Sequence, residues 1–505
     1  MSVASLFEEL DLLRDDVVRR IGIDGYDAQQ VAVDHFVWCR AFVDAAEAVR
    51  EWAASTTSEL AANVGRATED EARALFYGRD AAIAIRMGER YAAIARTYAP
   101  LEDLGAESEH RLLRTSLRQF AEREVRPQAQ EIHRRNADIP ESMITGVAKL
   151  GLFGLSVPEA YGGSQSERPD LRAMLIATEE LSRCSLGAGG SLMTRPEILV
   201  RALVRGGTTE QKQRWLPAIA RGSAQVAIAV TEPDAGSDVA AVRCRAIRKD
   251  DSWEITGTKL WCTFAGRAEL LMLLCRTSDA GHRGLSVFVV EKPAYPGAAF
   301  VHRQDGGGVL SGRAIPTIGY RGMHTFELAF EQYRLPSVAL LGGEDWLDRG
   351  FYLQLEGFAL GRLQTAGRAV GVMHAALDAA LSYASNRKMF GRTEIEFPLV
   401  LAKLGAMAVR LEASRRLAYR AARLLEDDAP GGQQAAALAK LYASRMAELV
   451  TREAMQLHGA MGYGEETEVS RLFVDARVLA IFEGAEDVLS LRVVGRDLLE
   501  APERT

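Results

Sequence analysis

The spacing of apolar residues changes twice along this 505-residue chain. It is helical up to about residue 224, changes to short runs between turn residues from 225 to 345, and returns to helical spacing from 346. Helices, then strands, then helices predict an α+β fold. We expect four domains: an N-terminal helical extension (1–103), a helical domain (104–224), a central antiparallel β domain (225–345) and a C-terminal four-helix bundle (346–505).

Particular segments carry this prediction. Thr68 to Glu71 has the pattern of a capping box, which predicts a helix start there that continues through Ala93 and ends at Tyr98-Ala99-Pro100. One buried helical face is expected before it, formed by Val33, Phe36, Val37, Ala41, Ala45, Ala48, Val49 and Trp52. Strands are expected at 226–230, 270–274, 285–290 and 326–330, and a long helix with an apolar stripe over 370–384.

Composition excludes several classes of function. The net charge of −7 and the lack of a Lys/Arg cluster argue against nucleic-acid binding. No apolar stretch reaches the ~20 residues of a membrane span, so no membrane span is expected. The acidic N-terminus lacks a signal pattern, and five scattered cysteines are typical of free thiols, so a cytoplasmic location is expected. The eight histidines are dispersed, so we expect no metal site.

The decapeptide Ala229 to Asp238 is the most informative motif. It follows an apolar run and contains Pro233, Asp234 and Gly236, which turns select. Thr231 and Ser237 add hydroxyls, and such a loop can hold an anionic cofactor through hydroxyl and main-chain donors. An ordinary turn is the alternative interpretation.

This decapeptide resembles the flavin-binding signature of the acyl-CoA dehydrogenase family. Six further segments match that family in order: 157–163, 211–217, 261–263, 387–391, 456–459 and 481–484. The resemblance covers roughly residues 106 to 500. It implies an FAD-dependent oxidoreductase that removes hydrogens from the α and β carbons of an acyl-CoA thioester. It also implies the three-domain fold of that family, to which the extension is added.

The resemblance also implies roles for particular residues. Glu483 is the expected base that abstracts the α-proton while the β-hydrogen passes to FAD as hydride. Gly361 stands where other members carry the base, so Glu483 is the only candidate of the two. The alternative for Glu483 is a solvated carboxylate that caps the helix expected near Glu486. Residues expected at the cofactor are Thr231, Ser237, Trp261, Thr263, Arg387, Gln456, Ala485 and Asp487. Residues expected at the substrate are Ser237, Arg362, Phe482 and Gly484.

Assembly and partners follow from the same resemblance. Arg387 and Gln456 match residues that reach the cofactor of a neighbouring subunit, so a homodimer or homotetramer is expected. The expected electron acceptor is electron-transfer flavoprotein, with oxygen as the alternative. Ala485 stands where the family usually has Thr, and Ala460 where it usually has Gly, so the details of the flavin contacts differ here.

The extension and the segments 190–195, 304–323 and 482–485 resemble family members that oxidise (2S)-methylsuccinyl-CoA to mesaconyl-CoA in the ethylmalonyl-CoA pathway. Such a substrate has a free carboxylate that needs a cation. Candidates are Arg195, Arg267, Arg313 and Arg321. Two alternatives remain open: a short or medium branched monocarboxylic acyl-CoA as substrate, and a non-catalytic helical scaffold with a decayed site.

Overall fold

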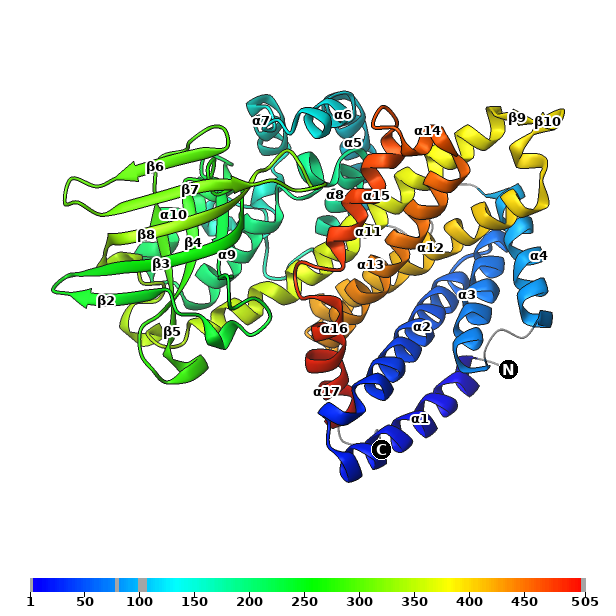
Figure 1. The fold of residues 1–505 in the computed structure, drawn as a ribbon, viewed down its shortest axis with the longest axis horizontal. Coiled ribbons are helices and arrows are strands. Elements are labelled where there is room, and N and C mark those ends of the chain that lie inside the picture. The colour runs from blue at the N-terminus through cyan, green and yellow to red at the C-terminus, as the bar shows by residue number, and fades with distance from the viewer. Residues whose placement is uncertain (1–2, 78–80, 99–106, 501–505) are drawn as a thin grey trace. The chain divides into compact units, whose positions relative to one another are not determined.

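The computed structural model describes residues 3–77, 81–98 and 107–500 (Figure 1). It divides into two compact units. The first consists of Met1–Gln119, Leu171–Cys184 and Arg362–Thr505, and the second of Phe120–Asp170 and Ser185–Gly361. Helix α11 (Gly350–Asn386) passes from the second unit into the first. The domain limits expected at 103, 224 and 345 stay a prediction.

The first unit is helical and contains only one short β-hairpin among its described residues. Its other helices are α1 (Val3–Asp24), α2 (Gln30–Ala54), α3 (Glu59–Tyr77), α4 (Ala81–Thr97), α5 (Ser108–Phe120), α8 (Leu171–Cys184), α12 (Pro398–Glu426), α13 (Gly432–Leu457), α14 (Ala460–Tyr463), α15 (Glu468–Leu479), α16 (Glu486–Val488) and α17 (Arg496–Glu500). The hairpin pairs β9 (Lys388–Met389) with β10 (Arg392–Thr393).

The N-terminal extension packs on the C-terminal helices. In Figure 1 the blue helices α2 and α3 run beside the yellow and orange helices α12 and α13, and α4 also packs on α12. Gly405 makes the α4–α12 contact possible, because a Cβ there would lie 1.8 Å from the Tyr91 carbonyl oxygen. The expected apolar face of α2 is confirmed, since all eight of its predicted residues are buried.

The expected start of the second helix at Thr68 is wrong. Helix α3 begins at Glu59, where the Ser58 hydroxyl accepts a hydrogen bond from the Ala61 N–H at 3.2 Å. Thr68 lies inside the helix, and its hydroxyl donates to the Val64 carbonyl at 2.9 Å. A Thr-x-x-Glu pattern inside a helix has the same letters as a capping box, because Thr can bond back to the preceding turn. A new helix, α4, begins at Ala81 and ends at Thr97; Ala99 and Pro100 lie outside the described residues.

Helices α5, α8 and α12 share a buried charge network. Glu179 lies at its centre and is fully buried, and its carboxylate accepts hydrogen bonds from Arg415 at 2.7 and 3.0 Å and from Arg114 at 3.3 Å. Burial acts to raise the pKa of Glu179, but Arg114 and Arg415, with His374, hold it well below the usual range. The network therefore depends on every partner keeping its charge.

The second unit is built around an eight-stranded sheet. Its helices are α6 (Arg126–Arg135), α7 (Glu141–Lys149), α9 (Thr194–Gly206) and α10 (Thr209–Ala220). Its strands are β1 (Val226–Ala229), β2 (Arg245–Lys249), β3 (Ser252–Thr263), β4 (Leu270–Arg276), β5 (Leu285–Glu291), β6 (Ala299–Arg303), β7 (Val309–Ile315) and β8 (Thr325–Pro336). The strand order is β1-β4-β2-β3-β8-β7-β6, with β5 paired to β4. The four predicted strands are present, and the sheet is antiparallel except for β1 and β2, which pair with β4 in parallel.

Both faces of β4 are buried. Leu270, Met272 and Leu274 pack with residues of α9 and α10, while Leu271 and Leu273 pack inside the curled sheet. A strand buried on both faces needs apolar residues at every position, which explains its continuous apolar run. Among the helices in the described part of the chain, none is both long and apolar enough to cross a membrane. All five cysteines are buried free thiols, as predicted.

Candidate active site

The loop after β1 is a tight turn that presents polar groups. The Glu232 N–H donates to the Ala235 carbonyl at 2.9 Å, and the Ala235 N–H donates back at 3.2 Å. Gly236 and Ser237 are exposed beyond this turn, and Thr231 is half-buried before it. The hydroxyl groups and the exposed backbone are therefore placed to receive a ligand.

Glu232 fixes this loop through hydrogen bonds to other segments of the β domain. Its buried carboxylate accepts hydrogen bonds from the N–H groups of Arg243 at 2.7 Å and Cys244 at 2.8 Å. The fully buried Lys259 ammonium donates to the same carboxylate at 2.7 Å and to the Val230 carbonyl at 2.9 Å. Sequence reasoning missed both Glu232 and Lys259, and the only signal was that Lys259 is the one lysine of β3.

Trp261 lies at an irregular point of β3. The pairing of β3 with β8 shifts register there, and Trp261 has a left-handed backbone with φ of +60°. This bulge directs the indole outward, so that 55% of the residue is exposed. Leu260, the residue directly before Trp261, donates its N–H to the Thr231 carbonyl at 2.8 Å. The Thr263 hydroxyl lies 3.0 Å from the Thr325 hydroxyl. The structure thus brings Thr231 next to the C-terminal part of β3, which carries Trp261 and Thr263.

Glu483 lies in a strained turn between α15 and α16. Its φ is +54° and that of Gly484 is +101°, so two successive residues are left-handed. Glycine adopts this conformation freely, whereas a glutamate does so at a cost of about 1–2 kcal/mol. The alternative role of capping α16 is not seen, because Ala485 is the N-cap residue and no side chain caps that helix end. Strain of this kind at a carboxylate favours a functional role.

Helix α13 holds the Glu483 turn in place. The Lys440 ammonium donates to the Gly484 carbonyl at 2.6 Å. One helical turn later, the Ser444 hydroxyl donates to the Leu479 carbonyl at 3.1 Å. These two bonds fix the turn on either side of Glu483. Sequence reasoning missed Lys440, whose only signal was a single lysine in the alanine- and leucine-rich stretch of α13.

The Glu483 carboxylate is half-buried and interacts electrostatically with two cations, Arg362 and Lys440. Its Oε2 atom is buried and has no hydrogen-bond partner among the described residues, and neither has the buried Nε atom of Arg362. Burial lowers the pKa of Arg362, and the charges of Glu483 and Asp497 oppose that shift. Burial likewise lowers the pKa of Lys440 to about 8, although Glu483 acts to raise it. The Glu483 Oε2 atom is therefore a buried acceptor whose lone pairs are not used by any described residue.

The remaining residues expected in this region lie close by in the chain. Phe482 is half-buried, and the guanidinium carbon of Arg368 lies 4.6 Å from its ring centroid. Ala485 is half-buried, while Gly484 and Asp487 are exposed.

Arg387 and Gln456 are brought to one end of the helical bundle. The Arg387 N–H donates to the Tyr383 carbonyl at 2.8 Å, at the end of α11. The Tyr383 ring stacks on His458 with ring centroids 4.3 Å apart, which joins this end of α11 to the end of α13 that carries Gln456. Both Arg387 and Gln456 are exposed.

Three of the four arginines considered for a substrate carboxylate already have partners. Arg267 forms ion pairs with Glu141 and Glu269. Arg321 donates to the carbonyls of Thr317 and His133, at 3.1 and 2.8 Å.

The buried Arg195 donates to the Ser191 carbonyl at 2.9 Å and to the Tyr320 hydroxyl at 2.7 Å.

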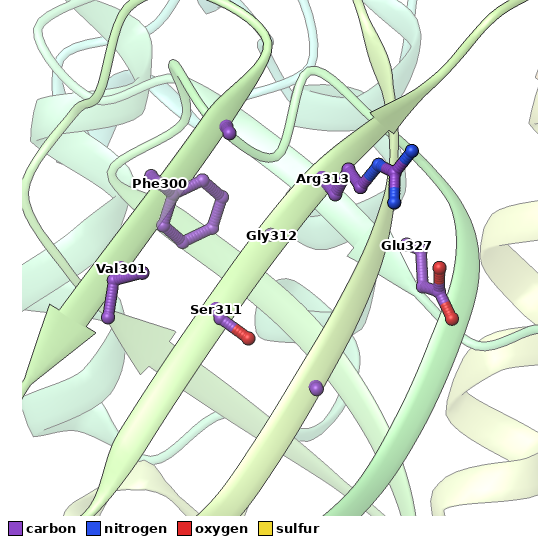
Figure 2. Close-up of a pocket in the computed structure, with 8 residues that line it drawn as sticks. Phe300, Val301, Ser311, Gly312, Arg313 and Glu327 are labelled. Atoms are coloured by element: carbon purple, nitrogen blue, oxygen red, sulfur yellow. The ribbon is translucent and has the colours of Figure 1, made fainter.

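Arg313 lies on β7 opposite Glu327 of β8, beside an open groove across β6, β7 and β8 (Figure 2). The Phe300 ring covers Gly312 in that groove, where a Cβ would lie 2.2 Å from the ring. The groove is lined by no other residue expected at the site.

Models of the acyl-CoA dehydrogenase family match most of the chain. The N-terminal domain model matches residues 107–223, the middle domain model 227–333 and the C-terminal domain model 348–499. The chain is 38% identical to (2S)-methylsuccinyl-CoA dehydrogenase of Cereibacter sphaeroides, over 82% of this chain and 76% of that protein. It is 35% identical to the mitochondrial short-chain specific acyl-CoA dehydrogenase of Bos taurus, over 76% of this chain and 89% of that protein.

Comparison with solved structures supports the same family. Butyryl-CoA dehydrogenase from Megasphaera elsdenii superposes with a TM-score of 0.71 at 28% identity, over 78% of this chain and 99% of that one. The chain belongs to the acyl-CoA dehydrogenase family. It is an FAD-dependent oxidoreductase that acts on acyl-CoA, and the interpretation as a non-catalytic scaffold is not supported.

The residues of the β1 loop and of β3 fit a flavin. An indole that is half-exposed on a strained backbone offers a flat apolar surface, and the neighbouring threonine hydroxyls and exposed loop offer polar groups. Within the described residues, no group of three or more His, Cys, Asp or Glu side chains is placed to hold a metal ion.

Proposed function

We propose that this enzyme oxidises (2S)-methylsuccinyl-CoA to mesaconyl-CoA and that Glu483 is the base. The observation that carries the assignment of the base is the Glu483 Oε2 atom, which is buried and unpartnered among the described residues. A general base must present a free lone pair to the proton it takes, and a strained, well-held turn presents it in one orientation.

In this proposal Glu483 takes the α-proton of the thioester at its carboxylate. The β-hydrogen leaves with the electron pair, and bound FAD supplies the acceptor for that hydride. Thr231, Ser237, Trp261 and Thr263 would hold the cofactor within one chain. Ala485 and Asp487, which follow the catalytic turn, would add contacts to the cofactor.

Four residues would bind the substrate: Ser237, Arg362, Phe482 and Gly484. Arg362 is the best candidate to pair with the free carboxylate of methylsuccinyl-CoA. Its buried Nε atom lacks a partner among the described residues, whereas Arg195, Arg267 and Arg321 are already bonded. A desolvated guanidinium gains most from an anion that completes its hydrogen bonds.

The match to the methylsuccinyl-CoA relative also supports this substrate. That match covers 82% of the chain, against 76% for the short-chain relative. The second candidate function is dehydrogenation of a short or medium branched monocarboxylic acyl-CoA, which the 35% identity to the short-chain enzyme favours.

A homodimer or homotetramer is part of the proposal. Arg387 and Gln456 are exposed at one end of the bundle and would complete the cofactor site of a neighbouring subunit. Large apolar side chains are exposed on the adjoining segments, with Phe390 at 92% and Tyr463 at 85%. Exposed aromatics of this size favour an interface with another chain.

A substrate panel tests the proposal. The purified enzyme is assayed with methylsuccinyl-CoA and with its neutral analogue 2-methylbutyryl-CoA, using an artificial electron acceptor. A site built for a carboxylate rejects an analogue that lacks it, so kcat/KM should favour methylsuccinyl-CoA by on the order of a hundredfold or more. Equal rates, or a preference for the neutral thioester, would establish the monocarboxylic alternative.

The physiological acceptor can be tested with the same preparation. We propose electron-transfer flavoprotein. The reduced enzyme should pass electrons to that protein much faster than to dissolved oxygen. Rapid peroxide formation in air would instead identify an oxidase.

A further inference from the structure

Lys440 is a buried charged residue. It lies in the first half of α13, in a stretch of sequence rich in alanine and leucine, and its side chain is fully buried. A buried ammonium is strongly disfavoured unless it is paired or hydrogen-bonded, so its partners indicate its purpose. Its ammonium donates a hydrogen bond outside its own helix, to the Gly484 carbonyl at 2.6 Å.

That bond is one of three by which α13 holds the turn around Glu483. The Ser444 hydroxyl binds the Leu479 carbonyl at 3.1 Å, before the turn. Arg445 forms an ion pair with Glu486, after the turn. Along the turn, the bond from Lys440 falls between these two attachments, at the carbonyl of Gly484, the residue that follows Glu483.

The Glu483 turn needs such support because its backbone is unfavourable. Glu483 and Gly484 are both left-handed, with φ of +54° and +101°. A hydrogen bond from an ammonium is stronger than one from a neutral donor, and here it fixes the Gly484 carbonyl in the orientation that this conformation requires. Ser444 and Arg445 bind outside the pair of left-handed residues, so they cannot replace the hydrogen bond from Lys440.

We propose that Lys440 is a positioning residue that acts through Glu483: it keeps the carboxylate of the base in its reactive orientation. The inference rests on the proposed role of Glu483 as the base. Lys440 itself would not touch the reacting atoms. A displacement of the base by about 1 Å can slow a reaction by about a hundredfold. Loss of Lys440 should therefore slow the chemical step and leave the affinity for the substrate nearly unchanged.

Because Lys440 is charged, its positioning of Glu483 should depend on pH. The charged groups facing it are Glu483 in the turn, Glu486 in α16, and Arg362 and Arg368 in α11. Burial lowers the pKa of Lys440 to about 8, against the opposing effect of the two glutamates. The ammonium is therefore lost as pH rises through about 8, which leaves a weaker, neutral donor to the Gly484 carbonyl.

The test uses the FAD-loaded enzyme and three variants. Lys440→Met keeps the length of the side chain and removes the charge. Lys440→Arg keeps a charge that does not titrate below about pH 12. Lys292→Met is the matched control, because Lys292 is also buried and donates to the carbonyls of Gly266 and Ala268 but lies in the β domain.

The measurement is anaerobic flavin reduction by whichever of methylsuccinyl-CoA and butyryl-CoA reacts faster. Lys440→Met should slow reduction by about tenfold to a hundredfold, while its Kd for the thioester changes less than about threefold. Lys292→Met should lower the melting temperature but leave the reduction rate per bound FAD unchanged. The wild-type rate should fall above about pH 8, and Lys440→Arg should keep its rate through that range.

A parallel Glu483→Gln variant separates this inference from the proposed function. If Glu483→Gln still reduces its flavin rapidly, the assignment of the base fails. If that variant is inactive but Lys440→Met reduces its flavin within about threefold of wild type, the role of Lys440 fails. In the double variant, loss of Lys440 should add nothing to the loss of Glu483, since residues that act as a unit are not additive. Should Lys440→Met not retain FAD, a flat wild-type profile from about pH 7 to about pH 10 would overturn the proposal by itself.

Discussion

Replacing Arg362 with Met should change the selectivity of the enzyme for substrate charge. Methionine has a similar stem and packs in an apolar site, so the substitution removes little except the guanidinium. The Nε atom of Arg362 has no partner among the described residues, and burial lowers the pKa of the group. The variant should therefore fold at least as well as wild type, because it no longer has to bury a cation.

The magnitude follows from the bond that would be lost. A hydrogen bond between a charged group and its partner contributes about 1.5–3 kcal/mol. At about 1.4 kcal/mol per factor of ten, kcat/KM for methylsuccinyl-CoA should fall by roughly 10- to 150-fold. The value for 2-methylbutyryl-CoA should change far less, because that substrate has no second carboxylate to pair.

The assay is steady-state kinetics on both thioesters with one enzyme preparation. Removing Arg362 also removes a cation near Glu483, and that effect should act on both substrates alike. It therefore cancels in the ratio of the two kcat/KM values. An equal loss on both substrates would show that Arg362 serves the base or the fold, and would refute its role as the carboxylate partner.

Two further predictions concern assembly and stability. Arg387→Ala should lose FAD and subunit association together, so its melting temperature should rise steeply with added FAD by mass action; a variant with full flavin content as a monomer would contradict the shared site. Glu179→Gln removes the carboxylate that balances the buried charges of Arg114 and Arg415. It should lower the free energy of unfolding by about 3–5 kcal/mol at neutral pH, measured by urea unfolding. The lowered pKa of Glu179 stabilises the wild type above the ordinary carboxylate pKa of about 4.3 and is lost as pH falls below it, so the variant should lose less stability on acidification than wild type.

Much of the fold could be predicted from apolar spacing. The buried face of α2 and the strands β1, β4, β5 and β8 were predicted because their periodicity reflects one or two buried faces. The start of α3 was not, because Thr68 and Glu71 have the letters of a capping box inside a continuous helix. The parallel pairing of β1 and β2 with β4 also escaped prediction, since a strand's own residues do not identify its partner.

The candidate site could be predicted only in part. Glu483, Thr231 and Trp261 were singled out by resemblance to a family, and their residue types suit the chemistry. The left-handed backbone at Glu483 and Trp261 has no signal in their side chains, since glutamate and tryptophan seldom adopt it. Lys440 and Glu232 stabilise the site through bonds to residues 44 and 27 positions away in the sequence, Gly484 and Lys259, and only the folded chain brings those segments together.

The central claim, that Glu483 is the base, is tested by flavin reduction in Glu483→Gln. The amide keeps the shape of the side chain and removes the basic oxygen. Mixed anaerobically with substrate, the variant should bind the acyl-CoA and remain yellow, with reduction slowed by about a hundredfold to ten-thousandfold. Glu466→Gln, an exposed glutamate before α15, is the control and should bleach at the wild-type rate. Rapid bleaching of the Glu483→Gln flavin by substrate would contradict the account.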